Sequence, residues 1–276
     1  MSRELTHAVA GISAYDRRGV GNTEAMADHQ HGSSTPFEGL GSHFMLSDNE
    51  GSAHLVMAEY EAVAERIARD GATHVLDWGC GFGYVAKFLR ERGVAVTLFD
   101  FDPNAAGTKQ TRLKAFPDVE VTVSDDAVRL PYPDGHFDAV LSLGTLEHVQ
   151  YPEQSVQEIR RVLASDGRFY LYKIPNRYSW VEFAARKSGK YYHGAHEHDR
   201  VYTFHSISQM IGKAGFDLGY AAHRNWFPLH RLSSIVDERY ADRFRRMSDL
   251  ITSTPGLRAL STNIELIATK RPDSVT

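Results

Sequence analysis

The sequence predicts a doubly wound α/β domain, in which one mostly parallel β-sheet carries helices on both faces. Short apolar runs typical of buried strands alternate along the chain with stretches whose apolar residues recur at helical spacing. A glycine-rich turn joins the first predicted strand to the helix after it, and ligands bind at such turns in open α/β sheets. The 276 residues contain no internal repeat, so one large domain with attached segments is the simplest organisation.

The predicted elements begin at residue 47, where Ser47 and Glu50 fit the capping box of a helix that Gly71 ends. We predict strands at 74–77, 94–99, 119–123, 137–143, 168–174, 216–222 and 263–270. Further helices are expected at 82–93, from 102, from 152, at 207–214 and at 233–251.

Three segments are expected to be attachments to this sheet. Residues 1–46 show no periodicity and form an irregular N-terminal segment that could close over a site as a lid, while 47–276 form the domain itself. Within the domain, 176–203 is predicted to be a long irregular loop on the substrate side, and 229–260 a helical cap insertion.

Composition excludes several classes of protein. Lys and Arg number 31 and Asp and Glu 35, for a net charge of −4, which argues against non-specific binding to nucleic acid or to a membrane surface. No stretch approaches the roughly 18 apolar residues of a membrane span. The N-terminus lacks the apolar core of a signal peptide. The single cysteine, Cys80, rules out an internal disulfide, and we expect a cytoplasmic protein.

The glycine-rich turn after the first strand is compatible with two classes of cofactor. Residues 81–86 can be fitted to the dinucleotide pattern, which places a pyrophosphate at a helix N-terminus. Asp77 lies immediately before the turn, however, and a carboxylate there suits a cationic ligand better than a pyrophosphate. Asp100, 21 residues after Gly79, can accept both hydroxyls of a ribose in either class. Asp126 could accept an adenine amino group, or be a solvated turn residue.

Five motifs occur in an ordered series: VLDWGCGFG, LFDFDP, DAVRLPYPDGHFDAVLS, LEHV and EIRRVLASDGRFYLYKIPN. Together they resemble class I S-adenosylmethionine-dependent methyltransferases of the small-molecule subgroup, over about residues 50–222 and more weakly over the last strand. The resemblance implies a Rossmann-like sheet of seven strands with an antiparallel last strand. It also implies S-adenosylmethionine as the methyl donor and S-adenosylhomocysteine as the product.

The resemblance also implies roles for individual residues along the carboxyl edge of the sheet. The methionine end of the cofactor would meet Asp77, Gly79, Cys80 and Gly81, and the ribose would be held by Asp100. The adenine would be flanked by Phe101 and bound by Asp126 and Ala127. Leu143 and Thr145, at the end of the fourth strand, would lie near the transferred methyl group, with Thr145 on the acceptor side.

His148 is the first candidate for a general base. Methyl transfer mainly requires alignment of the reacting atoms, and a base is needed only where the acceptor must lose a proton early. His148 follows the fourth strand, where the family places groups that face the acceptor, and histidine titrates near neutrality. The alternative is that His148 orients the loop before Pro152.

A second cluster of candidate residues lies in the run YYHGAHEHDR, at 191–200. Its aromatic residues, histidines and arginine could form an acceptor pocket, with His193 and His196 as catalytic candidates and Tyr192, His198 and Arg200 as binding residues. We predict no metal, because the spacing fits no standard zinc pattern. A polar loop packed over the sheet is the alternative. Lys173, in an otherwise apolar strand, is expected to pair with a carboxylate of the substrate or of the protein.

The sequence therefore predicts an enzyme that methylates a small molecule, at oxygen or nitrogen, with His148 as candidate base. Neither nucleic acid nor a membrane is an expected partner, and the oligomeric state is open, a homodimer being one option. Two alternatives remain open: an NAD(P)-dependent oxidoreductase that uses Gly81, Gly83 and Asp100, and a non-catalytic methyltransferase-like binding module.

Overall fold

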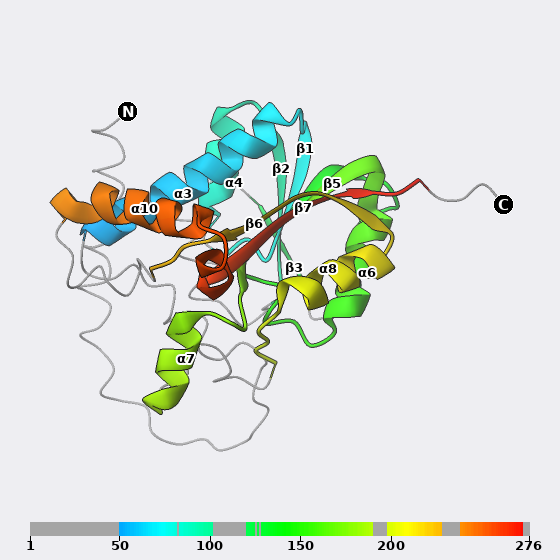
Figure 1. The fold of residues 1–276 in the computed structure, drawn as a ribbon. Helices are drawn as coiled ribbons and strands as arrows, with labels where there is room; N and C mark the ends of the chain where they lie inside the picture. The colour runs from blue at the N-terminus through cyan, green and yellow to red at the C-terminus, as the bar shows by residue number, and fades with distance from the viewer. Residues whose placement is uncertain are drawn as a thin grey trace, which may run out of the picture.

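Seven strands form a single sheet in the order β3-β2-β1-β4-β5-β7-β6 (Figure 1). The computed structural model describes residues 50–81, 83–101, 120–124, 126, 128–189, 198–227 and 238–272. The strands are β1 (His74–Trp78), β2 (Ala95–Asp100), β3 (Val121–Val123), β4 (Phe137–Leu143), β5 (Leu163–Pro175), β6 (Phe216–Arg224) and β7 (Asn263–Lys270). Strands β1 to β5 pair in parallel, and β7 runs antiparallel to both β5 and β6. The predicted fold class is confirmed, including the antiparallel last strand.

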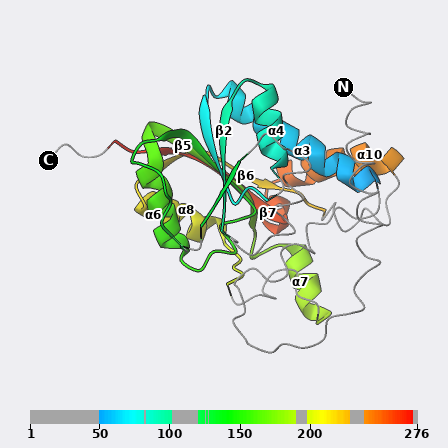
Figure 2. The same ribbon diagram turned by 180° about the vertical axis from the view of Figure 1, so that it is seen from behind.

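Helices cover both faces of this sheet (Figures 1 and 2). On one face, α3 (Glu50–Arg69) and α4 (Tyr84–Glu91) pack onto inward side chains of the central strands, such as Leu141 and Tyr170. On the other face, α6 (Pro152–Val162) and α8 (Phe204–Lys213) pack onto the alternate set, such as Val140 and Phe169. Because successive strand residues face opposite sides, a strand buried on both faces is apolar almost throughout, as the sequence of β4 is.

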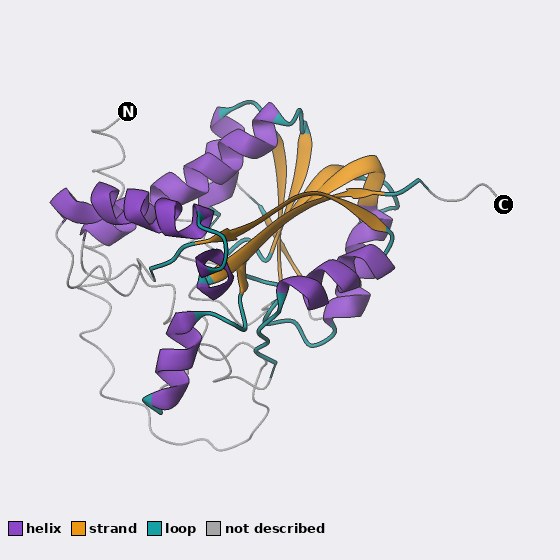
Figure 3. Ribbon diagram, in the orientation of Figure 1, coloured by secondary structure: helices purple, strands orange, loops and turns teal. Residues whose placement is uncertain are grey.

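Of the remaining described helices, two pack near β6 and the third lies apart from them. They are α7 (Trp180–Lys187), α10 (Glu238–Ser253) and the short 3₁₀ helix η2 (Leu257–Leu260), as Figure 3 shows. The helical insertion predicted at 229–260 is thus present as α10 and η2 within the described residues. Among those residues, no helix is both long enough and apolar enough to cross a bilayer.

The prediction of an irregular segment at 176–203 is wrong for residues 180–187, which form α7. The Ser179 hydroxyl caps this helix by accepting from the backbone N–H groups of Val181 and Glu182, and both of these residues are buried. A helix of two turns offers too few apolar positions to show a helical period in the sequence. Its one sequence signal is Ser179, the residue that caps it.

Strand β5 also differs from its prediction, because it begins at Leu163 instead of residue 168. Asp166, expected in a turn, has φ 59° and lies within this longer strand, where the register with β4 shifts between Phe137 and Ala139. Two predictions lie outside the described residues: the N-terminal segment 1–46 and the helix expected from residue 102.

Strand order places a topological switch point between β1 and β4. From β1 the chain proceeds outward to β2 and β3 on one side, and β4 then returns to pair with β1 on its other side. The loops that leave the carboxyl ends of β1 and β4 therefore diverge, and ligands of open α/β sheets bind in the crevice that this leaves.

Candidate active site

The glycine loop after β1 is held in a tight turn by backbone hydrogen bonds. Gly79 and Cys80 both donate their N–H groups to the carbonyl of Phe99 in β2, at 2.9 and 3.0 Å, and Gly83 donates to the carbonyl of Cys80 at 2.8 Å. Gly79, Gly81 and Gly83 have φ of 73°, 52° and 71°, which only glycine adopts without strain. The loop thus presents its backbone at the carboxyl edge of β1.

Gly79 and Thr145 join the loops after β1 and β4 in direct contact. The Thr145 hydroxyl lies 3.4 Å from the carbonyl of Gly79, to which it donates, and the Thr145 side chain occupies the space that a Cβ at Gly79 would need. Gly81 differs, since a Cβ there would meet no heavy atom within 4 Å. The two glycines therefore serve different purposes: Gly79 allows close packing between loops, and Gly81 leaves the backbone open to approach.

Two carboxylates predicted to bind the cofactor flank this loop. Asp77 lies near the end of β1 and is only 3% exposed. Asp100 ends β2, where its Oδ1 accepts from the N–H of Phe101 at 2.9 Å and its Oδ2 lies 3.9 Å from the Cys80 thiol. Cys80 is itself buried, in a small apolar cluster with Leu98 of β2. Asp77 and Asp100 thus both lie at the carboxyl edge of the sheet, and Cys80 approaches Asp100 there.

Residues predicted around the adenine lie in different surroundings. Phe101 is 7% exposed and packs edge-on against Trp78 and Phe99, so its ring belongs to the core. Asp126 is exposed, and its Oδ1 accepts from the N–H groups of Val128 and Arg129 at 2.9 and 2.7 Å, which lowers the pKa of the Asp126 carboxyl.

Asp126 therefore shapes the turn after β3 as an Asx turn, in keeping with the turn role that the sequence left open. Ala127 lies outside the described residues. Leu143, at the end of β4, is half-buried against the apolar cluster under α3 and α4.

His148 forms a close contact with Asp199, a residue 51 positions later in the chain. The His148 Nδ1 lies 2.8 Å from the Asp199 Oδ1, and its Nε2 lies 3.9 Å from the Glu147 Oε1. Burial lowers the pKa of the His148 imidazole, but its hydrogen bond to Asp199 and the charges of Glu147 and Asp199 outweigh this effect, so that the pKa is raised overall. Sequence reasoning assigned no role to Asp199, because nothing in the local pattern signals a contact across 51 residues.

Arg200 clamps the loop after β4. Its guanidinium donates to the carbonyls of Val149, Gln150 and His198 at 2.6, 3.0 and 2.9 Å, and its own N–H donates to the carbonyl of Glu147 at 2.9 Å. The Arg200 guanidinium is thus bonded to backbone carbonyls, and these bonds hold the segment that carries Asp199 against the loop after β4.

The other members of the predicted acceptor cluster are only partly visible. His198 is half-buried beside Arg200, and Tyr192, His193 and His196 lie outside the described residues. Among the residues that the structure does describe, no three His, Cys, Asp or Glu side chains gather as a metal site requires.

Lys173 is directed out of the sheet by a bulge in β5. Phe169, Leu171 and Ile174 face α6 and α8, so alternation would place Lys173 on that apolar face as well. Instead the β5–β7 register shifts between Leu171 and Ile174, and Lys173 adopts φ 59°. The bulge places its ammonium on the α3 side.

There the Lys173 ammonium lies 2.9 Å from the Glu59 Oε2 and 4.7 Å from the centre of the Tyr60 ring. The sequence left open whether Lys173 pairs with a carboxylate of the substrate or of the protein, and the structure pairs it with Glu59 of the protein. Asn225, which also has a left-handed backbone with φ 56°, donates to the other Glu59 oxygen at 3.0 Å.

Glu265 is the most strongly perturbed carboxyl near this bulge. It lies on β7, 3.3 Å from the Arg224 Nε, and its side chain is 11% exposed. Burial, with a smaller contribution from the neighbouring carboxylate of Glu59, raises the pKa of Glu265 to about 7 against the opposing effects of Arg224 and Lys173. The carboxyl ends of β5 and β6 and the amino end of β7 therefore carry a mixed set of charges at one edge of the sheet.

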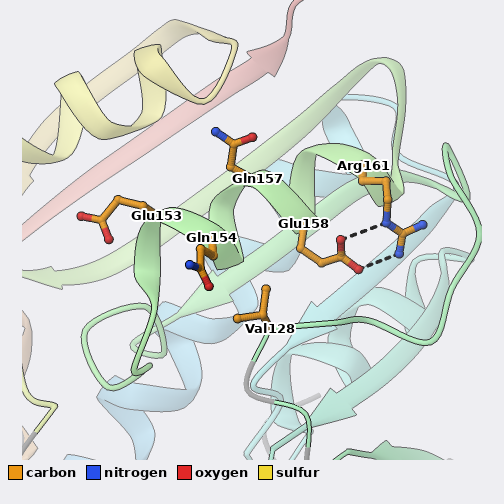
Figure 4. A pocket seen from close by; sticks show the side chains of 6 residues that line it. All are labelled: Val128, Glu153, Gln154, Gln157, Glu158 and Arg161. Atoms are coloured by element: carbon orange, nitrogen blue, oxygen red, sulfur yellow. Dashed lines mark hydrogen bonds and ion pairs between the residues drawn. The ribbon is translucent and has the colours of Figure 1, made fainter.

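An open groove of about 480 Å³ lies elsewhere, between α6 and the loop after β3 (Figure 4). Its lining residues are Val128, Glu153, Gln154, Gln157, Glu158 and Arg161. Glu158 accepts from the N–H of Leu130 at 2.9 Å and pairs with Arg161 at 2.7 Å, while Arg161 also pairs with Asp134 at 2.6 Å. These charges tie the loop to α6, and the groove contains no residue predicted for the cofactor.

Comparison with known proteins agrees with this geometry. A family model described as a methyltransferase domain matches residues 76–171, which run from β1 into β5. The chain is 29% identical to the ubiquinone biosynthesis O-methyltransferase of Chromobacterium violaceum, over 63% of this chain and 77% of that protein. It is 28% identical to the sterol 4-C-methyltransferase of Caenorhabditis elegans, over 41% of this chain and 34% of that protein.

Among solved structures, the [4+2]-cyclase SpnF shares the fold, with a TM-score of 0.54 and 19% identity over 79% of this chain and 81% of that one. A cyclase on this fold shows that architecture alone does not define the reaction.

The fold and the glycine loop at the switch point define a Rossmann-like α/β domain. Residues 76–171 match the methyltransferase-domain model, and the chain is similar to S-adenosylmethionine-dependent methyltransferases, whose methyl donor is S-adenosylmethionine. The oxidoreductase alternative finds no support in these comparisons. The chain covers only about a third of the length of the sterol relative, so the activity and substrate of that relative do not carry over to this chain.

Proposed function

We propose that this protein transfers a methyl group from S-adenosylmethionine to an oxygen or nitrogen atom of a small-molecule acceptor, with His148 as general base. The observation that carries the proposal is the place of His148 at the switch point. Its N–H donates to the carbonyl of Thr145 at 3.0 Å, and Thr145 in turn contacts Gly79 of the glycine loop. The imidazole thus lies within one turn of the junction at which cofactor and acceptor would meet.

The residues of the glycine loop fit the cofactor. The open approach to Gly81, where a Cβ would meet nothing within 4 Å, suits close contact between backbone and ligand. A buried carboxylate at Asp77 suits the ammonium group of the methionine end, and Asp100 at the end of β2 suits the ribose hydroxyls. When bound, S-adenosylmethionine supplies a methyl group already activated by its sulfonium.

The acceptor is proposed to be a small molecule with a hydroxyl or amine group. Relatives named for ubiquinone biosynthesis and for sterols support a small organic acceptor, and a base beside the switch point supports a group that loses a proton. The chain's net charge of −4 is consistent with our expectation that nucleic acid is not the acceptor.

The first test is calorimetric titration of the protein with S-adenosylhomocysteine, with NADH and NADPH in parallel. We expect micromolar binding of S-adenosylhomocysteine and none of either nicotinamide cofactor. Binding of a nicotinamide cofactor in its place would refute the proposal.

The second test is turnover with a panel of phenols, hydroxyquinones, carboxylic acids and amines, with mass spectrometry to detect the added methyl group. We expect the His148→Gln variant to retain its affinity for S-adenosylhomocysteine and to lose about 10²-fold or more in kcat. His205→Gln, on an exposed residue of α8, is the matched control and should retain full activity. Equal activity of the His148 variant at all pH values would remove the base from the proposal.

A further inference from the structure

Asp199 and His148 form a buried pair beside the candidate site. The Asp199 side chain is only 6% exposed and that of His148 16%, and their closest atoms, Oδ1 and Nδ1, are 2.8 Å apart. A carboxylate this deeply buried is costly unless it is paired and hydrogen-bonded, and a charge-assisted hydrogen bond of this length is among the strong ones. The contact is therefore a defined part of the fold.

Hydrogen bonds made by the residues that follow Asp199 fix its position. Arg200 anchors the segment to the loop after β4 through three hydrogen bonds to backbone carbonyls, and a fourth reaches the carbonyl of His198 in the same segment. Two residues further on, Tyr202 donates to the carbonyl of Pro175 at 2.8 Å and accepts from the N–H of Arg177 at 2.8 Å. The carboxylate thus approaches the imidazole from a segment that is hydrogen-bonded both to the loop after β4 and to the end of β5.

The two ring nitrogens of His148 have different surroundings among the described residues. Nδ1 has Asp199 at hydrogen-bond distance, whereas the Glu147 Oε1 is 3.9 Å from Nε2, too far for a hydrogen bond. Both carboxylates favour the charged imidazolium. A carboxylate that accepts the Nδ1 proton leaves the lone pair of the neutral ring on Nε2.

We propose that Asp199 is a positioning residue that holds the Nδ1–H tautomer of His148 and so makes Nε2 the nitrogen that removes the acceptor's proton. In that step the acceptor's O–H or N–H bond breaks as an N–H bond forms at Nε2, and the acceptor atom bonds to the methyl carbon as the carbon–sulfur bond breaks. The proton remains on the imidazolium, next to Asp199, until it exchanges with water. This inference rests on the proposed function of His148.

Replacement of Asp199 by Asn tests the inference through a pH profile. Above the raised pKa of His148 the base is free, so wild-type kcat should rise with pH through that pKa. The Asn removes one negative charge, which lowers the pKa of His148 and moves the inflection to lower pH. Its amide can also hold the wrong tautomer, so we expect the plateau of kcat to fall about 10²-fold. Affinity for S-adenosylhomocysteine should be unchanged.

Asp217→Asn is the matched control, because Asp217 is an exposed carboxylate on β6, 74% exposed at its side chain. It should leave both the inflection and the plateau of kcat as they are in the wild type. An Asp199→Asn variant with wild-type inflection and plateau would overturn the inference.

A second measurement does not depend on turnover or on the folding of the Asp199 variant. Nitrogen-15 NMR of histidine-labelled wild-type protein, with His148 assigned by its loss in His148→Gln, reports which ring nitrogen carries the proton above the pKa. We expect the Nδ1–H tautomer, and a predominant Nε2–H tautomer would overturn the role of Asp199. Wild-type protein that binds S-adenosylhomocysteine but methylates no acceptor would instead refute the proposed function, whatever the tautomer.

Discussion

Replacing Gly79 by Ala should destabilise the protein much more than the same change at Gly81. Both glycines have a left-handed backbone, with φ of 73° and 52°, so both variants incur the conformational penalty of about 1–2 kcal/mol for an L-residue in that region. Only at Gly79 does the added methyl group collide with another residue, because the Thr145 side chain fills that space. Overpacking of this kind costs about 1–3 kcal/mol more.

The free energy of unfolding should therefore fall by about 1–2 kcal/mol in Gly81→Ala and by about 2–5 kcal/mol in Gly79→Ala. Chemical denaturation followed by circular dichroism measures both values under identical conditions. The difference between the two variants isolates the packing between the loops after β1 and β4, since the backbone term is common to both.

A double-mutant cycle identifies Thr145 as the cause. Thr145→Gly removes the side-chain atoms that the new methyl group would meet, so the coupling energy between Gly79→Ala and Thr145→Gly should be favourable by about 1–3 kcal/mol. Equal stability of the Gly79 and Gly81 variants, or a coupling energy near zero, would refute the close packing of these two loops.

Three further outcomes follow from the carboxyl edge of the sheet. Asp100→Asn should weaken binding of S-adenosylhomocysteine about 10- to 100-fold by calorimetry, because hydrogen bonds to charged groups contribute about 1.5–3 kcal/mol; unchanged affinity would remove the ribose site. Because the pKa of Glu265 is about 7 in the fold and 4.5 is its ordinary value, the native protein retains a proton between these pH values that the unfolded chain releases. Stability should thus fall by at most about 3 kcal/mol as pH rises through this window. Glu265→Gln should flatten that slope in pH-dependent denaturation, and an unaltered slope would contradict the assignment. Arg200→Met should lower the free energy of unfolding by about 1 kcal/mol or more, since three partly buried or exposed carbonyls lose their donor; a raised KM for acceptor with unchanged stability would instead indicate the substrate contact that the sequence suggested.

Much of the fold could be predicted because its signals are local. The limits of β4 and β7 agree with the sequence prediction to the residue, since both strands are apolar runs bounded by polar residues or turns. The parallel sheet follows from the alternation of strands with helices. By contrast, α7 was missed because its one strong signal, the Ser179 cap, lies in a segment without apolar periodicity.

The candidate site divides in the same way. The glycines of the loop after β1 are visible in the sequence, because only glycine adopts the backbone that they require. That Gly79 is needed for contact with Thr145, while Gly81 is open, depends on a neighbour 66 residues away. The sequence left Asp126 as an adenine ligand or a turn residue, and the fold shows that its carboxylate accepts backbone N–H groups of its own turn.

The sequence by itself determined the sheet, the glycine loop and the resemblance to methyltransferases, because each depends on residue types at short and regular spacing. Only the tertiary structure decided which side chains meet. In the fold, His148 pairs with Asp199, and Arg200 donates to backbone carbonyls of the loop after β4. A bulge in β5 directs Lys173 toward Glu59. Such contacts join segments distant in the chain, and their geometry is set by strand order and register, which no local pattern encodes.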